Sequence, residues 1–375
     1  MDSLREVLTS GLTGSPRPLY PGAVALVVCD GTRQPAVAVG DALRYGDADG
    51  TELPIDMRVA MREETVFDVA SLTKVFTATV LMTLVEEGLL ALDEPIADHL
   101  PTFAAGDRRT VTLRHLLSHT SGLPDLLRLW TDWPDRAERR RAVLDVPLKS
   151  RPGTVFEYSC IGYIVGGYLA DKVSGRALSE LIQERICRPL GLADTGYLPS
   201  AEQVARAAAT EYQPQVGRGM VRGSVHDENS WSLGGIVGNA GIFSTARDVA
   251  RFGEMVRRGG ELDGIRILRD TTVSEMLRDQ LPEGIVPGFR HGLGFRIGDP
   301  NFMGALAASG AVGHTGFTGT SLVIDATRKL VVVLLTNRVH PSRDWSDIAA
   351  VRRRVAEVAA AGAVVTGAAT KERPA

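Results

Sequence analysis

An α+β fold is predicted by the order of strand and helix patterns along the 375 residues. Valine-rich segments that alternate around turn residues at 22–31 and 35–46 indicate strands near the start of the chain, and strand patterns return near its end at 291–299 and 319–341. Between them, apolar residues recur at helical spacings of three and four through most of 79–287. We therefore expect an antiparallel sheet that is built from both chain ends and flanked by helices, with an inserted all-helical domain.

The first elements are a short helix over 3–11 and the strands at 22–31 and 35–46. The apolar stretch VFDVASLTKVFTA (66–78) has a helical pattern with a single lysine, and the pattern continues to about residue 95. Gly88 loosens the end of this helix.

Helices dominate the insertion. A helix and turn are expected at 112–127, and a charged amphipathic helix at 135–146. The segment 160–192 predicts two helices that separate at Gly175, which suits a helix C-cap. The segment STARDVARFGEMVRRGG begins with Ser and Thr and has an aspartate in its first turn, which is a helix N-terminus signature.

The last part returns to strands. Within 319–341, the sequence DATRK predicts a hairpin turn between two apolar strands. A closing helix is expected at 344–362, and the small, polar tail from 363 to 375 is expected to be mobile.

This order predicts two domains. Residues 1–78 and 288–375 would form the sheet domain, and residues 79–287 the helical domain. The active site is expected in the cleft between the two domains.

Composition excludes several functional classes. A net charge of −3 provides no basic field for nucleic acid or acidic lipid, and no apolar run is long enough to span a membrane. Cys29, Cys160 and Cys187 are odd in number and far apart, so they fit neither a disulfide framework nor a zinc site. The first residues show no secretory-signal pattern, so a cytoplasmic location is expected.

One of only five lysines, Lys74, lies three residues after Ser71 in an apolar stretch. Residues three apart share a helix face, so the amine and the hydroxyl would be neighbours. A serine hydroxyl becomes a nucleophile when a neighbour accepts its proton, and lysine can do so if burial or positive charge lowers its pKa. A helix N-terminus would also stabilise negative charge on the serine oxygen. A serine N-cap beside a lysine that reaches solvent is the structural alternative.

Two further stretches support the chemical interpretation. FEYSCIGY contains Tyr158, and VGHTGFTGTSLVI places His314, Thr315 and Gly316 before an apolar strand. Together with the S-x-x-K motif and in this order, they resemble the serine β-lactamase and penicillin-binding-protein superfamily. The class C-like esterases and related serine hydrolases are the most similar. The resemblance covers most of the chain, including RHLLSHTSGLPD, VHDENSWSLGG, GNAGIFSTARDVARF and LLTNRVHP.

The resemblance implies a catalytic role for three residues. Ser71 would be the nucleophile that forms an acyl-enzyme, and Lys74 its hydrogen-bonded base partner. Tyr158 would be the general acid and base that protonates the leaving group and then activates the second nucleophile.

The resemblance also implies a substrate-binding wall. His314 stands where many relatives have lysine, and esterase-like members often have histidine there. Thr315 and Gly316 would lie on an edge strand along the substrate. The backbone N–H groups of Ser71 and Phe317 would form the oxyanion hole, where one donor contributes about 3–4 kcal/mol.

Cys160 departs from the family pattern, which has asparagine at this position. A thiol donates and accepts only weak hydrogen bonds, so Lys74 would have one strong partner fewer. This substitution argues against recognition of β-lactams and peptides. A second nucleophile at Cys160 is conceivable, but a small buried residue is the simpler interpretation.

Other chemistry-bearing residues have structural explanations. His115 and His119 could form a metal pair, but a helix and turn without the glutamate of zinc proteases is the better interpretation. The sequence HDEN (226–229) fits a hydrogen-bond hub in a loop. Three tryptophans of the insertion could line an acyl pocket or simply pack in the core: Trp130, Trp133 and Trp231.

The sequence therefore predicts a serine acyl-transfer enzyme. A Ser71 acyl-enzyme would form with a small-molecule ester or amide and would be resolved by water, as in an esterase or amidase. A transacylase that passes the acyl group to an amine or alcohol metabolite is the alternative. A β-lactamase, a DD-peptidase and an inactive binding homologue rank below these two. No metal, cofactor, nucleic-acid or membrane partner is expected, and the oligomeric state stays open.

Overall fold

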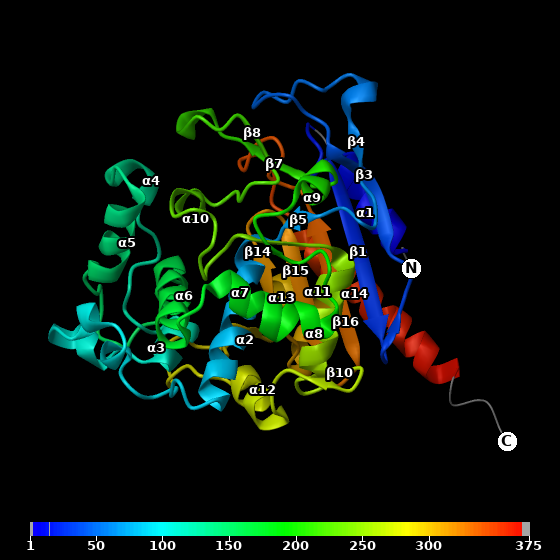
Figure 1. Cartoon of the computed structure of the whole chain (residues 1–375). Coiled ribbons are helices and arrows are strands. Elements are labelled where there is room, and N and C mark those ends of the chain that lie inside the picture. The colour runs from blue at the N-terminus through cyan, green and yellow to red at the C-terminus, as the bar shows by residue number, and fades with distance from the viewer. Residues whose placement is uncertain (1–2, 15, 370–375) are drawn as a thin grey trace.

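The computed structural model describes residues 3–14 and 16–369. The chain forms a large antiparallel sheet with helices on both faces, and a mainly helical region lies to one side (Figure 1). The predicted fold class is confirmed. Part of the tail predicted to be mobile, 363–369, continues the last helix α14 (Ala349–Ala369), because alanine favours helix. The rest of that tail, 370–375, lies outside the described residues.

The main sheet has nine strands, all paired antiparallel, in the order β12-β13-β14-β15-β16-β1-β3-β4, with β2 paired to β1. Its strands are β1 (Gly22–Cys29), β2 (Thr32–Arg33), β3 (Val37–Leu43), β4 (Val59–Ala60), β12 (Arg290–His291), β13 (Arg296–Ile297), β14 (Val312–Gly316), β15 (Thr320–Asp325) and β16 (Leu330–Thr336). The two chain ends meet where β1 pairs with β16, from Ala23 opposite Thr336 to Cys29 opposite Leu330.

Alternate side chains of β1 enter two different cores. Leu26 and Val28 belong to the larger core, whereas Ala25 and Val27 belong to a smaller one. Helix α11 (Ala246–Arg257) covers the first face, and α1 (Leu4–Leu12) and α14 cover the second (Figure 1). Because both faces are covered, the strand sequences are continuous apolar runs.

The strand predicted at 291–299 is shorter than expected. Two residues pair at β12 and two at β13, and the chain turns between them. Gly294 has φ +90°, and a left-handed residue interrupts a strand.

In the chain, helices and a few short strands lie between the N-terminal and the C-terminal strands of the sheet. The remaining helices are α2 (Thr73–Glu86), α3 (Leu113–Leu117), α4 (Leu129–Asp132), α5 (Arg136–Asp145), α6 (Cys160–Ser174), α7 (Leu178–Ile182), α8 (Arg188–Leu190), α9 (Ala201–Ala205), α10 (Glu228–Ser232), α12 (Asp270–Leu277) and α13 (Pro300–Met303). The short strands are β5 (Phe67–Asp68), β6 (Gly196–Tyr197), β7 (Ala209–Tyr212), β8 (Met220–Arg222), β9 (Ile242–Ser244), β10 (Glu261–Leu262) and β11 (Ile265–Arg266).

Helix α2 runs through the larger core and packs against α6. Its residues from Thr73 to Leu84 are all buried, which explains why apolar residues occur on every side of this helix. The helix predicted for 66–78 begins only at Thr73, because Phe67 and Asp68 pair with β9 as strand β5. Among the described helices, none combines the length and apolarity needed to cross a bilayer.

Candidate active site

A cavity of about 300 Å³ brings together five of the eight predicted site residues. It is lined by Ser71, Tyr158, Arg296, Thr315, Gly316, Phe317, Arg338, Asp347 and Arg352. Tyr158 comes from the helical insertion, and the others belong to segments near the two chain ends. The division into domains at 78/79 and 287/288 remains a prediction.

Ser71 lies in a 3₁₀ turn, Ala70–Leu72, directly before α2. Ala70 has φ +48°, a left-handed conformation that costs a non-glycine residue about 1–2 kcal/mol. The buried carboxylate of Asp68 accepts hydrogen bonds from the backbone N–H groups of Ala70 (2.8 Å) and His226 (2.6 Å). Asp68 therefore holds the strained backbone that presents Ser71, a role that sequence reasoning missed.

Lys74 is fully buried and directs its amine at three acceptors. Its Nζ lies 3.0 Å from Ser71 Oγ, 2.9 Å from the carbonyl oxygen of Asn239 and 3.6 Å from Cys160 Sγ. An ammonium has three N–H donors and no acceptor, so this arrangement suits the protonated form.

The charge of Lys74 differs from the expectation for a lysine base. Burial alone would lower the pKa of Lys74, but Cys160, Tyr158 and Asp227 outweigh it and raise the pKa above its ordinary value. This direction is opposite to the lowered pKa that a lysine base would need. Lys74 is therefore an ammonium at neutral pH in the free protein.

Cys160 is the first residue of α6, and its thiol faces Lys74. Burial raises the pKa of the thiol, so Cys160 is neutral at physiological pH. A neutral, buried thiol is a poor nucleophile, which argues against the second-nucleophile interpretation. The carbonyl of Asn239 provides the strong acceptor that the thiol does not.

Tyr158 lies in an irregular segment just before α6. The centre of its ring is 5.1 Å from Lys74 Nζ, and a hydrogen bond with Tyr158 contributes to the raised pKa of Lys74. The guanidinium carbon of Arg296 lies 5.7 Å from the same ring centre. The phenol therefore shares one cavity with Ser71 between two cations.

Strand β14 forms one wall of the cavity. A Cβ atom at Gly316 would lie 2.4 Å from the carbonyl oxygen of Val69, so only glycine allows this strand to approach the segment before Ser71. Thr320 fixes the same contact, because its hydroxyl donates to the Val69 carbonyl at 2.9 Å. Phe317 follows β14 and is 49% exposed, at the rim of the cavity.

His314 is buried beside Tyr158, with the two ring centres 6.0 Å apart. Its Nδ1 lies 2.8 Å from the carbonyl oxygen of Thr315, to which Nδ1–H donates. Burial, together with Arg296 and Lys74, holds the pKa of His314 well below its usual range. His314 is therefore neutral and supports the wall, whereas its neighbour Thr315 lines the cavity.

Three arginines of the cavity were not predicted from the sequence: Arg296, Arg338 and Arg352. Arg352 donates to the carbonyl oxygens of Gly316 (2.9 Å) and Thr320 (3.1 Å), and burial lowers its pKa to about 10. Asp347 is the single carboxylate among the residues that line the cavity. The cavity therefore has an excess of positive charge. No sequence signal singled these arginines out, because 37 of the 42 basic residues are arginines.

The structure also decides between several alternatives for other polar residues. His115 belongs to the capping box of α3, with Nδ1 accepting the N–H of Thr112 at 3.2 Å. Within the described residues, no group of three or more histidine, cysteine or acidic side chains could hold a metal ion. The predicted hub at 226–229 is confirmed, since His226 contacts Glu211 and Glu228 contacts Arg343.

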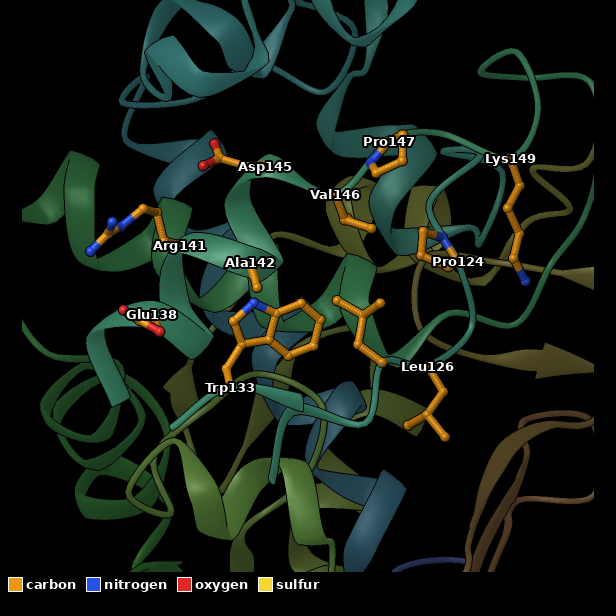
Figure 2. Close-up of a pocket in the computed structure, with 11 residues that line it drawn as sticks. Pro124, Leu126, Trp133, Glu138, Arg141, Ala142, Asp145, Val146, Pro147 and Lys149 are labelled. Carbon is orange, nitrogen blue, oxygen red and sulfur yellow. The ribbon is translucent and has the colours of Figure 1, made fainter. Parts of the chain in front are cut away.

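The tryptophans line other cavities. Trp133 lines a cavity of about 760 Å³ beside α5. Figure 2 shows its ring next to Ala142. Trp130 and Trp231 line a third cavity of about 420 Å³. Among the described residues, therefore, no tryptophan lines the cavity of Ser71.

Comparisons with known proteins agree with this geometry. A family model described as Beta-lactamase matches residues 18–357. The chain is 32% identical over 354 residues to the N-acetylmuramyl-L-alanine amidase of Bacillus subtilis (strain 168), covering 86% of this chain and 78% of that protein. An octameric penicillin-binding protein homologue from Pyrococcus abyssi has a TM-score of 0.68 at 26% identity, over 93% of this chain and 74% of that one.

A further solved structure has a similar fold. It is described as EstCE1, a hydrolase with promiscuous acyltransferase activity, and has a TM-score of 0.73 at 22% identity. The match covers 94% of this chain and 97% of the other.

Proposed function

The chain belongs to the Beta-lactamase family, and we propose that it is a serine acyl-transfer enzyme. In this proposal Ser71 attacks a small-molecule ester or amide. We place it in the class C-like branch of the family. One observation carries the proposal: Ser71 opens onto a cavity, bonds to the buried Lys74 and shares the cavity with Tyr158. In the structural alternative, a serine N-cap beside a lysine that reaches solvent, the serine would have neither a buried amine nor a phenol beside it.

The charge of Lys74 decides which residue orients the Ser71 hydroxyl and which one accepts its proton. The Lys74 ammonium donates to Ser71 Oγ, so it orients the hydroxyl and stabilises negative charge near it. A protonated lysine cannot accept the serine proton, which leaves Tyr158 as the base. The nearby cations Lys74 and Arg296 stabilise negative charge on the phenol oxygen.

The reaction then follows two steps. Starting as the phenolate, Tyr158 takes the Ser71 proton as Oγ bonds to the acyl carbon, and the proton passes to the leaving alcohol or amine as its bond to that carbon breaks. In the second step Tyr158 takes a proton from water as the water oxygen bonds to the acyl carbon. The bond between that carbon and Ser71 Oγ then breaks, the acid is released, and the proton returns to Ser71 Oγ. The backbone N–H groups of Ser71 and Phe317 would stabilise the oxyanion in both steps.

The excess positive charge of the cavity supports a proposal for the substrate class. Arg296, Arg338 and Arg352 line the same 300 Å³ as Ser71, against one carboxylate. Guanidinium groups bind carboxylates by charge-assisted hydrogen bonds. We therefore propose an ester or amide with a carboxylate close to the scissile bond.

Covalent labelling tests the function. A fluorophosphonate or a p-nitrophenyl ester is expected to add one acyl or phosphonyl group to Ser71, detected by mass spectrometry of peptides. The Ser71→Ala protein is the control and is expected to remain unlabelled. An adduct on a different residue, or no adduct on folded wild-type protein, would refute the proposal and favour an inactive binding protein.

The same acyl-enzyme allows a second outcome. In a transacylase, an amine or alcohol replaces water in the step that Tyr158 assists. Product analysis with and without candidate amines separates the two, since amide products form only by transfer. A cytoplasmic location, and a small molecule as the only partner, remain part of the proposal.

Removing one guanidinium tests the substrate class. Arg338→Gln is expected to lower kcat/KM about 10- to 100-fold for an ester that carries a carboxylate, because a charge-assisted contact is worth about 1.5–3 kcal/mol. The matching neutral ester serves as the internal control and should change by less than about threefold. Equal losses for the two esters would contradict an anionic substrate.

A further inference from the structure

His119 has no part in the steps above, although it is buried directly beside Tyr158. It lies two residues after α3 and is 1% exposed. Its backbone has φ +60°, a left-handed conformation that is uncommon for histidine. A strained backbone of this kind persists only where surrounding contacts fix it, and such residues often lie at functional sites.

His119 binds the backbone on both sides of Tyr158. Its carbonyl oxygen accepts the N–H of Glu157 at 2.9 Å, and its Nδ1 accepts the N–H of Ser159 at 3.0 Å. Residues 155–159 belong to no helix or strand, so no regular ladder fixes this backbone. The Ser159 hydroxyl adds a bond to the carbonyl of Pro124 at 2.6 Å. His119 therefore acts as a clamp: it accepts one hydrogen bond from the residue before Tyr158 in the chain and one from the residue after it.

The imidazole also contacts the phenol ring itself. The ring centres of His119 and Tyr158 are 4.4 Å apart, with 35° between their planes. Tyr163 and His291 pack against the other parts of the imidazole, at 5.1 Å and 5.0 Å. The imidazole therefore cannot rotate without displacing its neighbours, and it limits the positions that the phenol can adopt.

The clamp requires a neutral imidazole. Burial holds the pKa of His119 well below its usual range, and His291, Lys74, His314 and Arg296 act in the same direction. Since Nδ1 accepts a hydrogen bond, the proton of the neutral ring is on Nε2. A protonated ring would place a second donor against the N–H of Ser159.

We infer that His119 is a positioning residue that holds Tyr158 at the distance from Ser71 needed for proton transfer. This inference rests on the proposed function. It assigns His119 an effect on kcat rather than on KM, since its side chain does not line the cavity.

Two substitutions separate positioning from packing. His119→Ala removes the acceptor and the ring, and kcat is expected to fall about 10- to 100-fold, as expected when a catalytic group shifts by about 1 Å. KM should change by less than about threefold. Asparagine tolerates a positive φ and has a side-chain oxygen near the place of Nδ1, so His119→Asn should regain most of kcat.

Folded protein is counted by its cooperative thermal unfolding transition, which does not depend on the reactivity of Ser71, and kcat is expressed per folded molecule. If His119→Ala does not accumulate as folded protein, His119→Gln replaces it, because glutamine fills the volume but moves the acceptor by one carbon. The same loss of kcat is expected. His115→Ala is the matched control: it removes a histidine four residues earlier in the capping box of α3, and its kcat should equal that of the wild type.

A double-mutant cycle is decisive. If His119 acts through Tyr158, His119→Ala should cause no further loss in a Tyr158→Phe background. The inference would be refuted if the loss of kcat in the double variant equalled the product of the two single losses, or if His119→Ala kept wild-type kcat. Neither result would refute the proposed function. Wild-type activity in the single variant Tyr158→Phe would instead refute the proposed function.

Discussion

Lys74→Met is expected to lower kcat by about 10³-fold or more, because residues that act as a catalytic unit lose most of their activity together. The thioether fills the volume of the lysine stem but donates no hydrogen bond to Ser71 Oγ. The hydroxyl would lose its orientation, and negative charge on the Tyr158 oxygen would lose its nearest cation. Burst kinetics with a p-nitrophenyl ester measures the acylation step directly.

The same substitution should not destabilise the protein. Lys74 is a buried ammonium, and replacing a buried charge by an apolar side chain of similar volume is often neutral or stabilising. The melting temperature is expected to stay equal or to rise, which separates lost catalysis from lost folding. Lys172→Met, at an exposed position of α6, is the control and should retain wild-type kcat. Acylation at the wild-type rate in Lys74→Met would show that the ammonium has no catalytic role.

Tyr158→Phe is expected to lower kcat by about 10²- to 10⁴-fold, the usual contribution of a general acid and base. The ring would keep its contacts with His119 and its place between Lys74 and Arg296, and only the proton carrier would be lost. Both acylation and deacylation should slow, since the same phenol serves the two steps. Stopped-flow measurement of the burst and of the steady state distinguishes them.

Tyr168→Phe provides the matched control for the loss of a phenol. Tyr168 is a buried residue of α6 whose ring lies 4.4 Å from the guanidinium carbon of Arg140. Its removal should leave kcat unchanged. A similar loss in the two variants would point to general damage at α6, whereas no loss in Tyr158→Phe would require another proton acceptor.

The sequence predicted the parts of the site that depend on local spacing. Ser71 and Lys74 are three residues apart at a helix start, so their contact follows from helix geometry. The strands at 22–29 and 330–336 are continuous apolar runs, and these patterns predict buried strands. The fold class followed from the positions of such runs at both chain ends.

What the sequence did not predict depends on contacts between distant residues. The amine of Lys74 contacts Asn239 and Cys160, which lie 165 and 86 residues away in the chain. Arg352 reaches the cavity from α14, and its type is too common in this chain to attract attention. His119 acts through backbone groups, whose partners are not encoded in any local pattern.

The pairing of β1 with β16 also constrains how the protein is made. Strand β1 lies inside the sheet, between β3 and β16, and residues 22–29 find their partners at 330–336. During synthesis, the edge of β1 that pairs with β16 has no partner until about 300 further residues have emerged from the ribosome. Such long-range pairing slows folding and leaves an apolar strand edge open to other chains. The cavity of Ser71 can therefore assemble only after β16 and α14 have emerged, and nascent chains that stop before β16 would be candidates for chaperone binding or aggregation.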